Sequence, residues 1–189
     1  MNARHLPDNV GKSQAKAGAG RYVVRFALFA GVELALYYFP YDPGGVAAAC
    51  LRTYLASYAR LAGAALSLLD PSVHVHGADI VGRYSLTFAM NCDAMDVYIL
   101  FSSALLAFPA GARPRVLGLA AGLAALVTLN VLRIVSLYFV GLYFPGAFDF
   151  CHMDAWPMVI VIATCAGFLA WIRWSRARPV EGFDAVAEV

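Results

Sequence analysis

Three residues whose types could together support acyl-transfer chemistry lie in separate segments of the chain: Cys92, Arg133 and His152. A thiolate is a strong nucleophile, an imidazole moves protons near neutral pH, and a guanidinium keeps its charge and stabilises an oxyanion. Arg133 is the most informative, because it lies inside the apolar run 116–143, where charged residues are costly and usually functional. Asn130 lies three residues earlier on the same helical face. We therefore expect a buried polar site here, the alternative being an arginine that extends to the membrane surface.

Cys92 lies where a predicted hairpin ends and a predicted helix begins. The unpaired N–H groups and the dipole of a helix start favour a thiolate, whereas the nearby carboxylates of Asp93 and Asp96 oppose it. Asp96, one turn further on, shares the face of Cys92 and could contact a basic partner. Taken alone, Cys92 could equally be a small buried apolar residue.

The remaining candidates have less support from the sequence. Cys151 adjoins His152, but adjacent side chains diverge in regular structure, so the two make a poor nucleophile and base pair. His74 and His76 share a strand face, yet no further metal ligands are evident, and we predict no metal site and no cofactor. Glu33 lies in the first apolar run and could pair with Arg133 or face other helices.

Composition places the chain in a membrane. Of its 189 residues, 61% are hydrophobic and 14% charged, and its mean hydropathy is +0.68. A soluble domain is about half apolar and a quarter charged. The four cysteines have no metal-ligand spacing and predict no disulfide framework, and we interpret Cys50 and Cys165 as packing residues.

The apolar runs predict the elements that position these residues. The runs 22–40, 95–110, 116–143 and 156–174 are each interpreted as a membrane crossing, and 145–154 as a short loop. That loop has two acids and no Lys or Arg, whereas the other turn and the C-terminal end are basic, so the positive-inside rule places Cys92 and His152 on the outer side.

This topology requires an odd number of crossings before Cys92. The run 46–69 carries two arginines, Arg52 and Arg60, and is therefore predicted to be an amphipathic helix in the outer interface. Alternating residues in 73–77 and 82–88, around a glycine-containing turn, predict a small β-hairpin that leads into the Cys92 helix. The expected fold is an all-α integral membrane protein of four transmembrane helices, with this interfacial helix and hairpin.

We expect three regions along the chain. Residues 1–20 are predicted to be a disordered basic cytoplasmic tail, residues 21–176 a single membrane-embedded domain, and residues 177–189 a second cytoplasmic tail. The active site would face the periplasm from a bacterial inner membrane.

In its reactive residues the chain resembles the exosortase and archaeosortase family, most closely the short exosortase H type. The resemblance covers about residues 45–174 and is carried by MNCDAM at 90–95, NVLR at 130–133 and FDFCH at 148–152. Members of that family commonly follow the cysteine with a small residue and glycine, whereas Asp93 and Ala94 stand here.

The resemblance implies a membrane-embedded cysteine transpeptidase or peptidase in which Cys92 is the nucleophile, Arg133 the stabilising cation and His152 the acid/base. Asn130 and Asp96 would support the site. Its partners would be exported proteins with a C-terminal tripartite sorting signal: a variant of the Pro-Glu-Pro motif, a transmembrane helix and a basic end. No nucleic acid partner is expected. The alternatives are a plain intramembrane protease and a non-enzymatic transporter or scaffold in which Arg133 binds an anion or pairs with Glu33.

Overall fold

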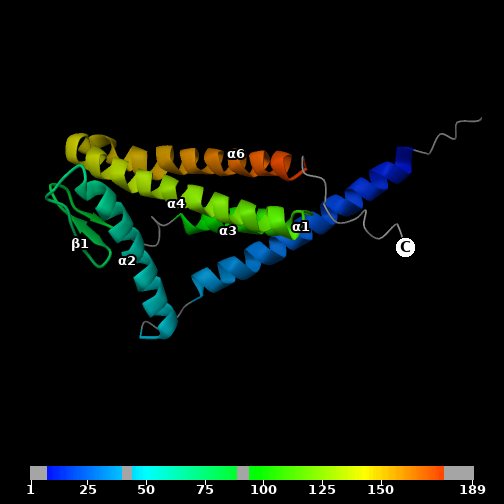
Figure 1. Cartoon of the computed structure of the whole chain (residues 1–189), viewed down its shortest axis with the longest axis horizontal. Helices are drawn as coiled ribbons and strands as arrows, with labels where there is room; N and C mark the ends of the chain where they lie inside the picture. The colour runs from blue at the N-terminus through cyan, green and yellow to red at the C-terminus, as the bar shows by residue number, and fades with distance from the viewer. Residues whose placement is uncertain (1–7, 40–43, 89–93, 177–189) are drawn as a thin grey trace, which may run out of the picture.

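Helices make up most of the part of the chain that the computed structural model describes, residues 8–39, 44–88 and 94–176. A three-stranded sheet lies between the second and third long helices in the sequence (Figure 1). The elements are α1 (Asp8–Tyr38), α2 (Val46–Ser67), β1 (His74–His76), β2 (Asp79–Val81), β3 (Leu86–Thr87), α3 (Met95–Ala107), α4 (Ala112–Tyr143), a 3-10 turn (Pro145–Ala147), α5 (Phe148–Phe150), a π-helical turn (Cys151–Ala155) and α6 (Trp156–Arg176).

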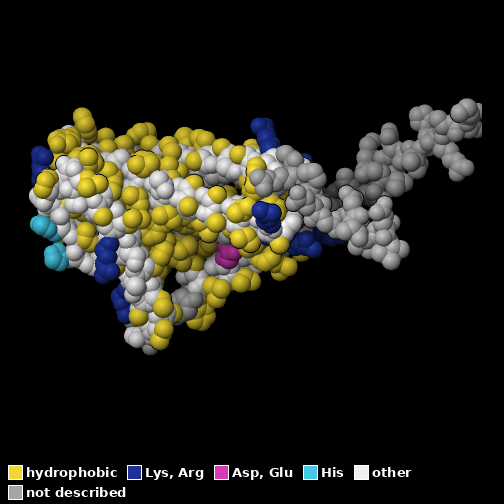
Figure 2. All heavy atoms as spheres, in the orientation of Figure 1, with side chains coloured by type: hydrophobic (Ala, Val, Ile, Leu, Met, Phe, Trp, Pro, Cys, Tyr) yellow, Lys and Arg dark blue, Asp and Glu magenta, His cyan; other side chains and the backbone are white. Residues whose placement is uncertain are grey.

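Two stretches are long and apolar enough to cross a membrane, Ala112–Tyr143 and Pro145–Arg176. Of their most apolar windows, 33% of the first and 11% of the second are buried inside the described chain, so many of their apolar side chains face outward. Figure 2 shows the same pattern, with hydrophobic side chains over the middle of the molecule and Lys and Arg side chains toward its ends. Outward-facing apolar helices are the arrangement that a lipid solvent stabilises. α3 is a shorter apolar helix, and the four-crossing topology remains a prediction.

The first helix begins earlier than we predicted. Residues 1–20 were expected to be disordered, but α1 begins at Asp8 and continues without a break into the first apolar run. Alanines recur in this part of the chain, and alanine is the strongest helix former, so a helix nucleated in the apolar run can extend back through it. The tail predicted for residues 177–189 lies outside the described residues.

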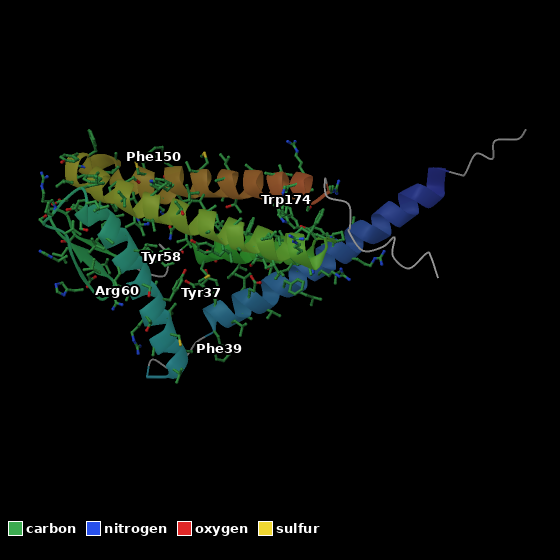
Figure 3. All side chains as sticks on the ribbon, viewed as in Figure 1. Tyr37, Phe39, Tyr58, Arg60, Phe150 and Trp174 are labelled. Carbon is green, nitrogen blue, oxygen red and sulfur yellow. The ribbon has the colours of Figure 1, made fainter. Side chains whose placement is uncertain are left out.

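α2 has the amphipathic pattern expected of an interfacial helix. Its buried residues recur on one face, which packs against α4 and β1, whereas Arg52 and Arg60 are exposed. Figure 1 shows α2 steeply inclined to α4 and α6, and Figure 3 shows Tyr58 and Arg60 on opposite sides of it. The Tyr58 ring stacks on Phe88, and the hydroxyls of Tyr58 and Tyr98 are hydrogen-bonded at 2.6 Å. These contacts connect α2 to α3.

The predicted hairpin is present, but its strands are paired differently. His76 pairs with Asp79 across the two-residue turn Gly77–Ala78, so the partner of β1 is β2, a segment that we had placed in the turn. Gly77 has a φ of +63°, which glycine adopts without a steric penalty and which such tight turns require. Most of the predicted second strand, 82–88, is irregular, and only β3 pairs with β2.

Tyr138 of α4 fastens the sheet to the helices. Its hydroxyl donates to Asp70 Oδ2 at 2.8 Å and accepts from the backbone N–H of Arg83 at 3.0 Å. The hydroxyl and N–H of Ser72 donate to Asp70 Oδ1 at 2.7 and 3.0 Å. One buried tyrosine therefore holds both ends of the segment that contains β1 and β2.

α6 contacts α4 near the cytoplasmic end expected for both helices. The indole N–H of Trp171 donates to the carbonyl of Pro114 at 2.9 Å, and the ring lies where a side chain at Gly118 would otherwise be. Between this contact and the π-helical turn, small residues of the two helices line a groove of about 720 Å³.

The contacts of Asp70 predict a pH-dependent stability. Hydrogen bonds from Ser72 and then Tyr138 lower the pKa of Asp70, so its stabilising effect is complete above the unfolded pKa, about 3.9, and is lost as the pH falls through the folded value. Asp70→Asn should lower the Tm by a few degrees at pH 7, and this difference should shrink below about pH 4. Thermal unfolding of the detergent-solubilised protein between pH 7 and pH 3 measures it. Asp79→Asn, at an exposed position of the same sheet, is the matched control and should change the Tm little. A difference that persists unchanged to pH 3 would contradict the role assigned to the carboxylate.

Candidate functional site

α4 buries the two polar residues that the sequence singled out. Asn130 and Arg133 are 1% and 5% exposed, and they share one helical face with Leu126, Ile134 and Leu137. Side chains three and four residues apart project from the same side of a helix. Both residues are therefore buried by the rest of the described chain, as predicted for a buried polar site.

Arg133 contacts the segment that carries His152. Its Nη2 donates to the backbone carbonyl of His152 at 3.3 Å. His152 is half-buried, and its ring makes an edge contact with Phe148, the two centroids 5.6 Å apart. The structure thus brings a fixed positive charge next to a residue that can transfer protons. Arg133 and His152, which the sequence predicted to act together, thus meet through the backbone carbonyl of His152.

The segment 145–154 is helical, although we predicted a loop. A 3-10 turn, α5 and the π-helical turn Cys151–Ala155 follow one another into α6, and His152 is the second residue of the π-helical turn. A π-helical turn holds an extra residue compared with an α-helix and occurs often at functional sites. The turn directs the carbonyl of His152 toward α4, where Arg133 binds it.

Asp96 does not lie with this pair. It is exposed in the first turn of α3, and its Oδ1 accepts a hydrogen bond from the hydroxyl of Tyr38 in α1 at 2.8 Å. The basic partner that we expected for Asp96 is thus replaced by a phenol. Asp96 connects α3 with α1, and its position at a helix start is favourable for a negative charge.

Glu33 is likewise separate from Arg133. Its Oε2 accepts hydrogen bonds from Ser102 at 2.6 Å and from Ser103 at 3.4 Å, both in α3. The alternative in which Arg133 and Glu33 pair has no support among the described contacts. Glu33 accepts its hydrogen bonds from α3, whereas Arg133 donates to the segment before α6.

Cys92 and Asp93 lie outside the described residues. The chain becomes described again at Ala94, the N-cap of α3, which has a φ of +57° and a ψ of +24°. This left-handed conformation is unfavourable for a residue with a Cβ. Ala94 stands where the resembled family has its glycine, and it adopts, at a steric cost, a conformation that glycine would adopt without one.

The other cysteines and the two hairpin histidines suggest no further site. Cys50 and Cys165 are exposed, so their assignment as packing residues is wrong, and Cys151 is half-buried. His74 and His76 are exposed on β1. Within residues 8–39, 44–88 and 94–176, no cluster of three or more His, Cys, Asp or Glu side chains could hold a metal ion.

Two polar contacts away from the predicted site were also missed from the sequence. The Asp70–Tyr138 hydrogen bond joins residues 68 positions apart, and the Glu33–Ser102 contact joins residues 69 positions apart. Asp70 could have been noticed as a turn former, since it stands in Asp-Pro-Ser directly after a helix. Nothing local in the sequence indicates which hydroxyl groups Glu33 meets.

Comparison with known proteins adds no relative: no family model, no curated protein and no solved structure matches the chain. The resemblance to exosortases therefore depends on the motifs at 90–95, 130–133 and 148–152 alone.

The left-handed conformation of Ala94 predicts how a glycine at this position would change the stability of the fold. Ala94→Gly should stabilise the folded protein by about 1 kcal/mol, because it removes the Cβ that the left-handed region penalises. Gly77→Ala is the matched inverse, since Gly77 has a similar φ and a Cβ there would meet no atom within 4 Å. It should destabilise by a similar amount. Chemical or thermal unfolding of the purified protein measures both, and a neutral or destabilising Ala94→Gly would show that this φ is not a constraint.

Proposed function

We propose that the protein is a membrane-embedded cysteine transpeptidase or peptidase, resembling an exosortase, that cleaves C-terminal sorting signals of exported proteins. The observation that carries the proposal is the buried guanidinium of Arg133 bound to the backbone of His152. A permanent charge inside an apolar bundle is costly and is usually retained for function. Its neighbour is the residue that the motif pattern assigns to proton transfer.

In the proposed reaction, the thiol of Cys92 gives its proton to His152, and the thiolate attacks the peptide carbonyl of the sorting signal. The carbonyl oxygen becomes an oxyanion that the guanidinium of Arg133 stabilises. As the tetrahedral intermediate collapses, the C–N bond breaks and His152 returns the proton to the leaving amine. A thioester between Cys92 and the substrate remains.

The second half-reaction releases the thioester. An amine that attacks the same carbonyl gives a new amide and a transpeptidase, whereas water gives a carboxylate and a protease. In both cases His152 removes a proton from the nucleophile, and Cys92 leaves as the thiolate. Product mass distinguishes the two outcomes.

The architecture is compatible with a substrate anchored by its own transmembrane helix. Two described helices are long and apolar enough to cross a bilayer, and α2 has the exposed arginines and inclination of an interfacial helix. We infer four crossings, with the site at the periplasmic surface of a bacterial inner membrane and the basic turn before α4 in the cytoplasm. A sorting motif just outside its anchoring helix would reach the reactive residues there.

Cys92→Ser tests the chemistry directly. Serine keeps a similar volume and a hydrogen-bonding group, so folding and insertion should survive, but its hydroxyl is a far weaker nucleophile than a thiolate. Processing of a reporter with a matching C-terminal signal should stop, and the unprocessed reporter should accumulate in the membrane. Immunoblotting of the reporter measures this.

The other three cysteines provide controls for Cys92→Ser. Cys50→Ser, Cys151→Ser and Cys165→Ser should leave processing largely intact. Wild-type processing by Cys92→Ser would make the transpeptidase proposal wrong. If Cys151→Ser alone abolished processing, Cys151 and not Cys92 would be the nucleophile.

Arg133→Lys tests the oxyanion role. An ammonium keeps the positive charge but lacks the planar, fixed donors of a guanidinium, so the processing rate should fall by about 10² to 10³. The rate is measured with the same reporter, and the Tm of the variant shows whether the bundle has been retained. Near-normal processing would show that the guanidinium is not needed in the reaction.

A further inference from the structure

Glu33 is a charge that the proposed reaction does not use. It lies in α1, half-buried against α3, and its hydrogen bonds come from the hydroxyls of Ser102 and Ser103. Within the described part of the chain, no Lys, Arg or His side chain forms an ion pair with it. Ser102 lies seven residues after the start of α3, about 10 Å along that helix, so the carboxylate lies well inside the apolar layer of the proposed topology.

A carboxylate in hydrocarbon is expensive, and such residues usually pair with a cation. Two hydroxyl groups donate hydrogen bonds but supply no positive charge. If the only role of Glu33 were to hold α1 to α3, a glutamine would make the same contacts at a lower desolvation cost. The charge itself therefore requires an explanation.

The carboxylate opens on a groove. A cavity of about 400 Å³ lies between α1 and α3, with Leu123 of α4 also in its lining, on the side of these helices where Figure 3 shows Tyr37. The residues that line the cavity recur three or four positions apart in α1, and the same holds in α3. Residues at this spacing lie on one face of a helix, so the groove runs along the two helix axes. The lining includes Glu33, Leu36 and Tyr37 from α1 and Tyr98, Ile99 and Ser102 from α3.

Among the residues that the structure describes, the rest of α1 leaves this side open to a neighbour. Leu28, Val32 and Leu36 are 63%, 58% and 61% exposed, so α1 contacts the rest of the described chain mainly through α3. An apolar groove parallel to two helices is the shape that a third helix fills. A carboxylate in its wall adds a requirement for positive charge.

We propose that the groove containing Glu33 binds a transmembrane helix of a partner protein that carries a lysine or arginine at matching depth. The basic side chain forms an ion pair with Glu33, while Ser102 keeps its hydrogen bond to the carboxylate. Apolar residues of the partner helix pack on Leu36 and Ile99. The inference depends on the membrane embedding that we propose but not on the peptidase chemistry.

A synthetic transmembrane helix of leucine and alanine with one central lysine is a suitable probe. The full-length protein carries a donor dye at its C-terminus, the peptide carries an acceptor, and both are reconstituted in phosphatidylcholine vesicles. Förster transfer should show that the lysine peptide associates about five- to tenfold more strongly than the same peptide with leucine in place of lysine, as expected for one interhelical polar contact. Equal association of the two peptides would overturn the proposal.

Two variants separate charge from packing. Glu33→Gln keeps an acceptor for Ser102 but removes the charge, and it should abolish the preference for lysine. Adding Ala35→Glu to Glu33→Gln restores a carboxylate at an exposed position on the side of α1 opposite Glu33 and Tyr37, and should not restore the preference. A preference that survives in either variant would mean that the lysine binds elsewhere, which contradicts the proposal.

A lipid ammonium group is the competing occupant. If the wild-type preference disappears when phosphatidylethanolamine is added to the vesicles, the groove binds a lipid head group and the helix proposal is wrong. A preference that persists supports a helix. Because this assay measures association alone, it can fail while Cys92 and Arg133 behave as proposed, and the reverse is equally possible.

Discussion

The placement of a guanidinium in an apolar bundle is the constraint on which the site depends. Arg133 cannot lose its proton at any physiological pH, so burying it requires acceptors at fixed positions. One of these is the backbone carbonyl of His152, which the π-helical turn before α6 directs toward α4. The contact also holds the N-terminal end of α6 next to α4, as Trp171 holds the other end. The same hydrogen bond that gives the buried guanidinium an acceptor therefore sets where the backbone of His152 lies.

α4 is the helix against which α2, the sheet and the segment before α6 are arranged. Arg133 binds the segment before α6, and Tyr138, five residues later, binds Asp70 and the backbone of Arg83. α2 and the sheet are thereby held over the same half of α4 that carries the guanidinium. In a membrane, apolar contacts between helices gain little from the hydrophobic effect, because lipid is as apolar as the helix surface. Buried hydrogen bonds of this kind then carry much of the specificity of packing.

The parts of the fold that hydropathy controls could be predicted from the sequence, and those that depend on distant contacts could not. The predicted runs 95–110, 116–143 and 156–174 became α3, α4 and α6 with ends within four residues, because apolar length is a strong and local signal. The strand pairing was wrong because Gly77–Ala78 forms a tighter turn than the alternation suggested. Of the site, the burial of Asn130 and Arg133 was predicted correctly. The carbonyl of His152 as a partner and the phenol on Asp96 were not, because neither is encoded in residue type or spacing.

Glu33 and Arg133 show why two opposite charges in one apolar bundle need not be a structural pair. An ion pair between them would satisfy both at once, and the sequence allowed it. The fold instead gives Glu33 hydroxyl donors on α3 and gives Arg133 a carbonyl on the far side of α4. Two buried charges that are kept apart have a desolvation penalty that is less compensated than the penalty of a buried ion pair. Such an arrangement is expected when each charge serves a different interaction: the guanidinium beside His152 faces the proposed reaction, and the carboxylate on α1 faces the surface where another helix can pack.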